Sequence, residues 1–233
     1  MQQRIGPVFI PAGAANAFPD PRTADRDGLL AIGGDLSVER LLVAYESGVF
    51  PWYGDGLPVL WWSPDPRAVM DVETLHVSRS LRRRLQRGGF ELSWNRAFGK
   101  VLRACGEERD TGTWIIPEMI VAYERLHRRG HAHSLEVWEE GRLVGGLYGV
   151  QCGGLFAAES KFHRRTDASK IALVAAVRSL FARGVRLFDV QFLTSHLRSL
   201  GAREIAREEY LQRLERACDL KVDLTSLDPA RFV

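Results

Sequence analysis

The segment from His133 to Gln191 constrains the fold most, because three strand-like runs, a helix and a fourth strand follow one another there. Glu-Gly at 140–141 and Gly-Gly at 153–154 are typical of tight turns between antiparallel strands. The expected strands cover residues 133–138, 142–151, 155–162 and 187–192. A helix over 168–182, capped by Thr166 or Asp167, would connect the third strand to the fourth. Such a crossover favours pairing of these two strands, so we predict an α+β fold with a mostly antiparallel mixed sheet.

The N-terminal part has a different character, with many Pro and Gly residues around one short helix that begins after Ser37 and ends before Gly48. Composition changes near residues 62–66, where prolines interrupt the chain. We therefore expect a small N-terminal domain over residues 1–65 and a larger domain over residues 66–233. Further helices are expected over residues 78–86, 95–105 and 117–129.

The order of elements in the larger domain resembles the fold of the acetyltransferase (GNAT) superfamily. An acetyl-CoA enzyme would carry a glycine-rich loop before the helix, where backbone N–H groups cradle a pyrophosphate. Residues 163–167 read His-Arg-Arg-Thr-Asp and contain no glycine. The sequence thus predicts an acetyltransferase-like fold that uses another acyl carrier.

Composition limits the possible classes of protein. The 233 residues are 45% hydrophobic and 26% charged, with a net charge of +3, which is ordinary for a globular protein and permits a polyanionic partner. Cys105, Cys152 and Cys218 lie far apart, so we expect neither a disulfide framework nor a metal site. No apolar run approaches the length of a membrane span. We expect a cytoplasmic monomer without membrane contact.

The fourth strand carries Asp189 and Gln191 within an apolar run. Side chains at positions i and i+2 of a strand point to one face, so these two groups would address one spot. An unpartnered polar group in a buried strand costs about 1–3 kcal/mol. The pair is therefore either a hydrogen-bonded pair within the sheet or part of a functional site.

Several separate motifs resemble the leucyl/phenylalanyl-tRNA–protein transferase family in consistent order from about residue 18 to residue 211. They occupy residues 28–36, 48–52, 61–67, 112–115, 130–134, 159–160 and 189–191. The resemblance implies transfer of Leu or Phe from aminoacyl-tRNA to the free α-amine of proteins that begin with Arg or Lys, which marks them for the bacterial N-degron pathway. It implies no cofactor.

The resemblance also implies roles for individual residues. Gln191 would accept a hydrogen bond from the attacking amine, Asp189 would hold and polarise its amide, and Glu159 would orient the aminoacyl group, although a Glu at such a position is also typical of the surface. Because the ester is already activated, positioning of the amine can suffice and no covalent nucleophile is needed.

Binding roles follow from the same resemblance. Trp52 and Trp114 would stack on the terminal adenine, and Tyr45 and Tyr123 would border the cleft. The apolar pocket for the amino-acid side chain would comprise Leu147, Phe156, Leu173, Ala176 and Leu180. Ala176 and Leu180 are smaller than the aromatic residues familiar at these positions, so the preference among Leu, Phe and Met stays open.

Five arginines crowd the helix expected over residues 78–86 and its end: Arg79, Arg82, Arg83, Arg84 and Arg87. Such a cluster favours contact with the phosphates of tRNA through backbone and shape. Two alternative functions remain. An acetyl-CoA-dependent N-acyltransferase is disfavoured by the missing glycines, and a non-catalytic RNA-binding module leaves Asp189 and Gln191 without a purpose.

Overall fold

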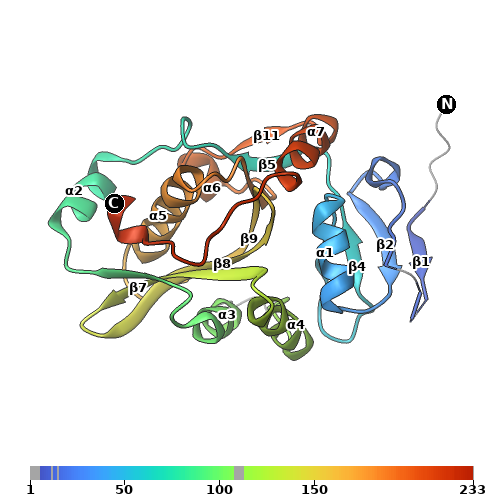
Figure 1. Cartoon of the computed structure of the whole chain (residues 1–233), viewed down its shortest axis with the longest axis horizontal. Helices are drawn as coiled ribbons and strands as arrows, with labels where there is room; N and C mark the ends of the chain where they lie inside the picture. Colours follow the sequence, from blue (N-terminus) through green and yellow to red (C-terminus); the bar gives the residue numbers. More distant parts are fainter. Residues whose placement is uncertain (1–5, 12, 15, 108–112, 233) are drawn as a thin grey trace.

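The computed structural model describes residues 6–11, 13–14, 16–107 and 113–232. Its N-terminal part forms a four-stranded sheet with strand order β1-β2-β4-β3. The strands are β1 (Val8–Ile10), β2 (Leu29–Gly33), β3 (Phe50–Pro51) and β4 (Leu60–Trp62). The helix α1 (Val38–Glu46) lies between this sheet and the rest of the molecule (Figure 1). The Ser37 side chain caps α1, as predicted, by accepting a hydrogen bond from the Arg40 N–H.

The larger sheet has seven strands in the order β11-β5-β10-β9-β8-β7-β6. The strands are β5 (Arg67–Met70), β6 (Glu91–Trp94), β7 (Ala132–Glu139), β8 (Arg142–Cys152), β9 (Leu155–His163), β10 (Leu187–Gln191) and β11 (Arg203–Ile205). Among the described pairs of this larger sheet, only β9·β10 is parallel, and the others are antiparallel. The prediction of a mostly antiparallel mixed sheet, with the fourth strand beside the third, is confirmed.

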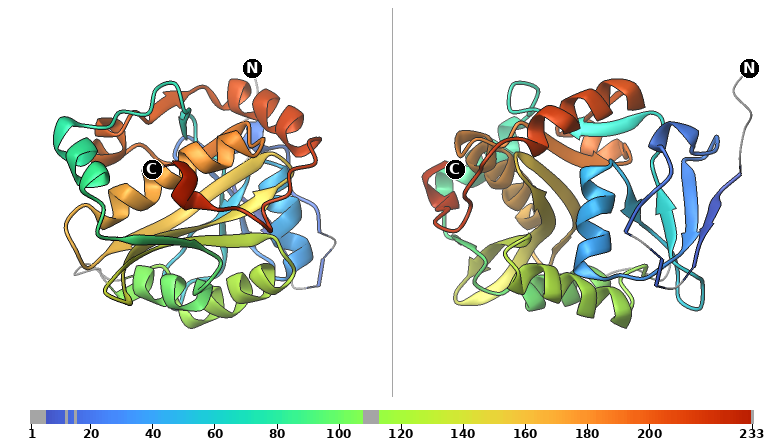
Figure 2. Two further views of the ribbon diagram at one scale, coloured as in Figure 1. Left: turned by 60° about the vertical axis from the view of Figure 1, so that its left-hand side comes forward. Right: turned by 45° about the vertical axis from the view of Figure 1, so that its right-hand side comes forward.

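Helices cover both faces of the larger sheet, as Figures 1 and 2 show. The remaining helices are α2 (Arg79–Arg87), α3 (Phe98–Glu107), α4 (Pro117–Arg128), α5 (Ala168–Ala182), α6 (Ser195–Ser199), α7 (Arg207–Cys218) and two short 3-10 turns, η1 (Pro21–Thr23) and η2 (Pro229–Phe232). A Cβ on Gly145 would lie 2.6 Å from Ala168 of α5, and one on Gly146 would lie 3.3 Å from Val101 of α3. Successive strand residues face opposite sides, so α5 and α3 cover opposite faces.

Two buried apolar layers result from this arrangement. One lies between the larger sheet and α5 and includes Val174 and Val177. The other joins the opposite face to α3, α4 and α1 and includes Leu41 and Tyr148. No helix in the described ranges is both long and apolar enough to span a membrane.

Some local predictions were wrong. Asp167 occupies the N-cap position of α5, but with a φ of 66° its side chain does not cap the helix and instead contacts Lys170 Nζ at 2.8 Å. The helix expected from residue 95 begins at Phe98, because Asn95 has a φ of 60°. Three strands of the larger sheet were not predicted: β5, β11 and β6, which pairs with β7 along the sheet edge.

Candidate active site

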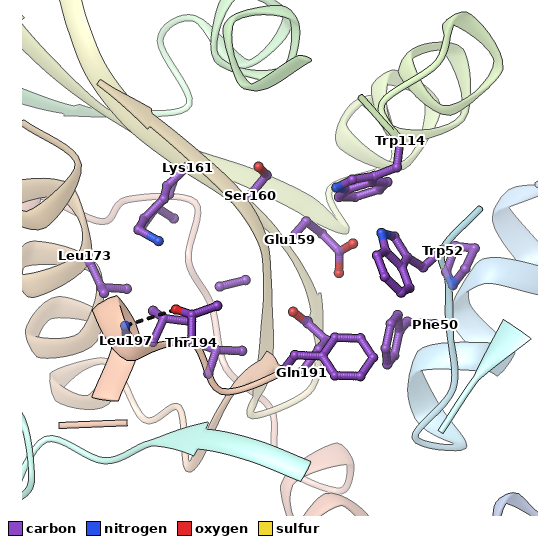
Figure 3. A pocket seen from close by; sticks show the side chains of 15 residues that line it. Phe50, Trp52, Trp114, Glu159, Ser160, Lys161, Leu173, Gln191, Thr194 and Leu197 are labelled. Atoms are coloured by element: carbon purple, nitrogen blue, oxygen red, sulfur yellow. Dashed lines mark hydrogen bonds between the residues drawn. The ribbon is translucent and has the colours of Figure 1, made fainter. Parts of the chain in front are cut away.

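A pocket of about 380 Å³ lies between the middle of β9, the end of β10 and the β3 segment of the N-terminal part. One side is aromatic, formed by Phe50, Trp52, Trp114 and Phe192. The other side is apolar and is lined by Leu147, Ala158, Leu173, Val190 and Leu197, with Lys161 and Thr194 beside them. Glu159 and Gln191 lie between the two sides (Figure 3). The pocket thus joins a flat aromatic surface to an apolar cavity through two polar groups.

The aromatic side is pre-formed by ring packing. The Trp52 ring lies 5.5 Å from the Phe192 ring and 5.7 Å from the Trp62 ring, centroid to centroid. The Trp62 indole N–H donates to the carbonyl oxygen of Trp52 at 2.6 Å. Trp52 nevertheless remains 43% exposed. An exposed, fixed indole of this kind can stack on a planar ligand such as a nucleobase.

Gln191 enters the pocket through an irregularity at the end of β10. The register with β5 shifts between Asp189 and Gln191, and Gln191 has a left-handed backbone with a φ of 58°. In the amide orientation that satisfies its neighbours, the side-chain nitrogen donates to the carbonyl oxygens of Ala158 at 3.0 Å and Val190 at 3.1 Å. These two bonds leave the amide oxygen as the group that is available to accept from a ligand.

Asp189 does not line the pocket, because the bulge breaks the expected i, i+2 alternation. Its carboxylate is fully buried and accepts from Arg67 Nε at 3.0 Å and from the Tyr210 hydroxyl at 3.0 Å. It also accepts the backbone N–H of Gln191 at 2.9 Å. The expectation that Asp189 holds the Gln191 side-chain amide is therefore wrong, since Asp189 holds the Gln191 backbone.

Glu159 also projects from a bulge, because the β8·β9 register pairs Tyr148 with Ser160 and Gly149 with Ala158, which leaves Glu159 unpaired. Glu159 Oε2 accepts from the Tyr123 hydroxyl at 3.1 Å, and that hydroxyl lies 2.6 Å from the Tyr45 hydroxyl. Glu159 Oε1 is buried and has no hydrogen-bond partner among the described residues.

Burial raises the pKa of Glu159 from its ordinary 4.5 to about 8, against the opposing effect of hydrogen bonds from Tyr45 and Tyr123. Near neutral pH this carboxyl therefore favours its protonated form. A ligand that offers N–H groups or positive charge to Oε1 would satisfy that oxygen and favour the ionised form.

The structure brings together part of the predicted set. The pocket is lined by Trp52, Trp114, Leu147, Leu173, Glu159 and Gln191. Tyr45 and Tyr123 are fully buried behind Glu159 and hold its carboxyl instead of bordering the pocket. Phe156, Ala176 and Leu180 are fully buried in the core and do not line it. Gly112, which belongs to one of the motifs, lies outside the described residues.

The residues that sequence reasoning missed are Phe50, Phe192, Lys161, Arg67 and Tyr210. Phe50 and Arg67 stand inside motifs quoted for the family resemblance, so that signal was present. Tyr210 lies on an amphipathic helix where an aromatic residue is typical of ordinary core packing. Nothing in the local sequence links it to Asp189.

The basic cluster on α2 divides into two parts. Arg79, Arg82, Arg83 and Arg87 are exposed. Arg84 forms an ion pair with Glu139 and lies 5.1 Å over the Phe90 ring, so it anchors the helix. Arg84 therefore differs from the other four arginines, because Glu139 balances its charge. Across the described ranges, no group of three or more His, Cys, Asp or Glu residues is placed to hold a metal ion.

Comparison with known proteins extends these observations. Residues 69–215 match the family model described as leucyl/phenylalanyl-tRNA protein transferase, and residues 34–65 match the model of its N-terminal domain. A leucyl/phenylalanyl-tRNA–protein transferase from Anaeromyxobacter sp. (strain Fw109-5) is 58% identical over 206 residues, which cover 87% of this chain and 88% of that protein. One from Citrobacter koseri is 52% identical over 200 residues, 85% and 86% of the two chains.

Among solved structures, that of L-PGS from Bacillus licheniformis aligns with a TM-score of 0.38 and 16% identity over 73% of this chain and 57% of its own. The family models and the relatives, by contrast, cover most of the sequence, including the segments that form both sides of the pocket. This chain belongs to the leucyl/phenylalanyl-tRNA protein transferase family.

Proposed function

We propose that this protein transfers Leu or Phe from aminoacyl-tRNA to the free α-amine of proteins that begin with Arg or Lys, which generates an N-degron. The single observation that carries the proposal is the pocket, where an aromatic surface and an apolar cavity meet at Glu159 and Gln191 in a member of this family. An aminoacyl-adenosine has the matching parts: a flat base, a polar ester and α-amine, and an apolar side chain.

Each side of the pocket then binds a different part of the substrate. The terminal adenine stacks on Trp52 and Trp114, a contact worth about 1–3 kcal/mol per base. The Leu or Phe side chain enters the cavity lined by Leu147 and Leu173. Selection there acts by desolvation, which excludes polar side chains but separates large apolar ones only weakly. Met is thus a further candidate substrate.

The chemistry requires an amine held against an activated ester. The acceptor nitrogen attacks the carbonyl carbon, the new C–N bond forms, and the bond from that carbon to the ribose oxygen breaks. The proton that nitrogen loses ends on the ribose oxygen. The Gln191 amide oxygen accepts from the attacking amine, and Glu159 Oε1 accepts from the α-amine of the aminoacyl group. Positioning of this kind supplies several kcal/mol of the barrier without a covalent intermediate.

The exposed arginines of α2 supply the electrostatic contact with tRNA. Each phosphate neutralised by an Arg releases condensed counterions, so binding weakens steeply with salt. Arg79, Arg82, Arg83 and Arg87 offer four such contacts on one helix. No base-reading arrangement is needed, because a tRNA acceptor stem can be recognised by shape and backbone.

We infer further that the larger domain has the acetyltransferase-like fold and that the domains cover residues 1–65 and 66–233. The parallel β9·β10 pair joined through α5 supports the first point. The change from β4 of the smaller sheet to β5 of the larger sheet between Trp62 and Arg67 supports the second. We place a monomeric enzyme in the cytoplasm, where charged tRNAs are found.

The test uses the protein, Phe-tRNA or Leu-tRNA labelled in the amino acid, and peptides that differ only at the N-terminus. We expect label in peptides that begin with free Arg or Lys and none in peptides that begin with Ala or acetyl-Arg. Transfer to acetyl-Arg would contradict attack by the α-amine. Binding of charged tRNA with no turnover would favour a non-catalytic RNA-binding module, and saturable binding of acetyl-CoA would favour an N-acyltransferase.

A further inference from the structure

Arg67 contacts both the segment that carries Phe50 and the strand β10, although it does not line the pocket itself. It is 1% exposed and lies at the start of β5. Its Nη1 donates to the Gly48 carbonyl oxygen at 3.1 Å, and its guanidinium lies 4.6 Å from the centroid of the Phe50 ring. Phe50 belongs to the aromatic side of the pocket. Arg67 therefore fixes the segment that leads into the aromatic side.

The same guanidinium holds the strand that carries Gln191. Arg67 Nε and Nη2 donate to the two oxygens of Asp189 at 3.0 and 2.6 Å, which is the bidentate geometry of strong Arg–carboxylate pairs. The guanidinium also packs on Tyr210, 4.5 Å from the ring centroid. The Tyr210 hydroxyl donates to Asp189 Oδ2 at 3.0 Å. Asp189 is thus held in one orientation by charge, hydrogen bonds and packing.

The orientation of Asp189 matters because of the backbone of Gln191. A residue other than glycine in the left-handed region carries strain, and such strain persists only where surrounding contacts maintain it. The contact that maintains it here is the bond from the Gln191 N–H to Asp189 Oδ1, at 2.9 Å. If the carboxylate turned, Gln191 would lose this bond and its side chain would no longer be directed into the pocket.

We propose that Arg67 and Tyr210 are positioning residues for aminoacyl transfer: they orient Asp189, which fixes the backbone of Gln191 at the pocket and couples it to the aromatic side through Phe50. The proposal rests on the proposed function. A purely structural role would lower rate and affinity together. The positioning role predicts that the rate of the chemical step falls by a larger factor than the affinity for the substrate.

Tyr210→Phe is the sharpest test, since it keeps the ring against Arg67 and removes only the hydroxyl, which donates to Asp189 at 3.0 Å and accepts from Arg67 Nη2 at 3.4 Å. We expect the single-turnover rate of Phe transfer from Phe-tRNA to an Arg-initiated peptide to fall about tenfold, the effect of about 1.4 kcal/mol on a barrier. The affinity for a Phe-tRNA analogue with an unreactive 3′-amide link should stay within about twofold. Tyr53→Phe is the matched control, because its hydroxyl contacts Glu118 at 3.3 Å and not Asp189; its rate should match that of the wild type.

Arg67→Lys provides a second variant that keeps the positive charge but loses the bidentate geometry. Its rate should fall at least as far as that of Tyr210→Phe, and by a larger factor than its affinity. Unchanged rates in both variants would overturn the inference, and so would a loss of affinity that equals the loss of rate. A wild-type protein that transfers no Phe would instead refute the proposed function itself, and this inference with it.

Discussion

The Glu159→Gln substitution replaces a buried carboxyl by an amide of nearly the same shape that cannot ionise. The pKa of Glu159 is raised by burial from 4.5 to about 8. Between these two values the folded protein binds a proton that the unfolded chain has released. The folded state of the wild type therefore loses stability as the pH rises from about 4.5 to about 8, and no further above that.

Each pKa unit corresponds to about 1.4 kcal/mol, so between pH 6 and pH 9 the wild type should lose about 2.7 kcal/mol of unfolding free energy through Glu159. The Gln variant has no such dependence. The difference in unfolding free energy between variant and wild type should thus grow in favour of the variant by about 2–3 kcal/mol over this range.

The assay is equilibrium unfolding in urea, followed by tryptophan fluorescence, for both proteins at pH 6, 7, 8 and 9. Taking the difference between the two proteins cancels the contributions of other titrating groups. A difference that stays constant within about 0.5 kcal/mol across this range would refute the reasoning, since it would mean that the pKa of Glu159 lies in its ordinary range.

Three further predictions follow from other buried and exposed charges. Arg67→Ala should lower the unfolding free energy by about 3–5 kcal/mol in urea titrations because it leaves Asp189 buried without its cation, whereas the neutral double variant Arg67→Met/Asp189→Asn should recover most of that loss. Burial lowers the pKa of His133 from 6.5 to about 4. The unfolding free energy should therefore fall by about 3 kcal/mol as the pH falls from 6.5 to 4, and His133→Gln should remove this pH dependence. Replacing four exposed arginines by Ala should reduce the slope of log K against log [salt] for tRNA binding, measured by filter retention, by up to about 3.6, which is four contacts at about 0.9 each, whereas Arg84→Ala should leave the slope nearly unchanged. The four are Arg79, Arg82, Arg83 and Arg87.

The order of four neighbouring strands in the larger sheet, β7 to β10, was predictable because it depends on local signals. The turns at 140–141 and 153–154 set two hairpins, and the crossover through α5 placed β10 beside β9. The helix capped by Ser37 followed from the same kind of short-range chemistry. Strand β6 was missed because its pairing with β7 depends on a partner about 40 residues away.

The site was harder to predict because two bulges create it. Regular alternation would place Asp189 and Gln191 on one face of the strand. Because of the bulge at Gln191, the Gln191 side chain lines the pocket and Asp189 is buried against Arg67 and Tyr210. The bulge at Glu159 likewise depends on the register with β8. The long-range contacts of Asp189 with Arg67 and Tyr210 cross 122 and 21 residues and leave no periodic trace in the sequence.

The most direct test of the central claim is a quench-flow single turnover with enzyme in excess over Phe-tRNA and an Arg-initiated peptide present. Two products are followed in the same reaction: deacylated tRNA and peptide extended by Phe. We predict that both appear in equal amounts with one rate constant, and that an acetylated peptide abolishes both. Deacylation of the tRNA without extension of the peptide, or no reaction at all with intact charged tRNA, would contradict the account.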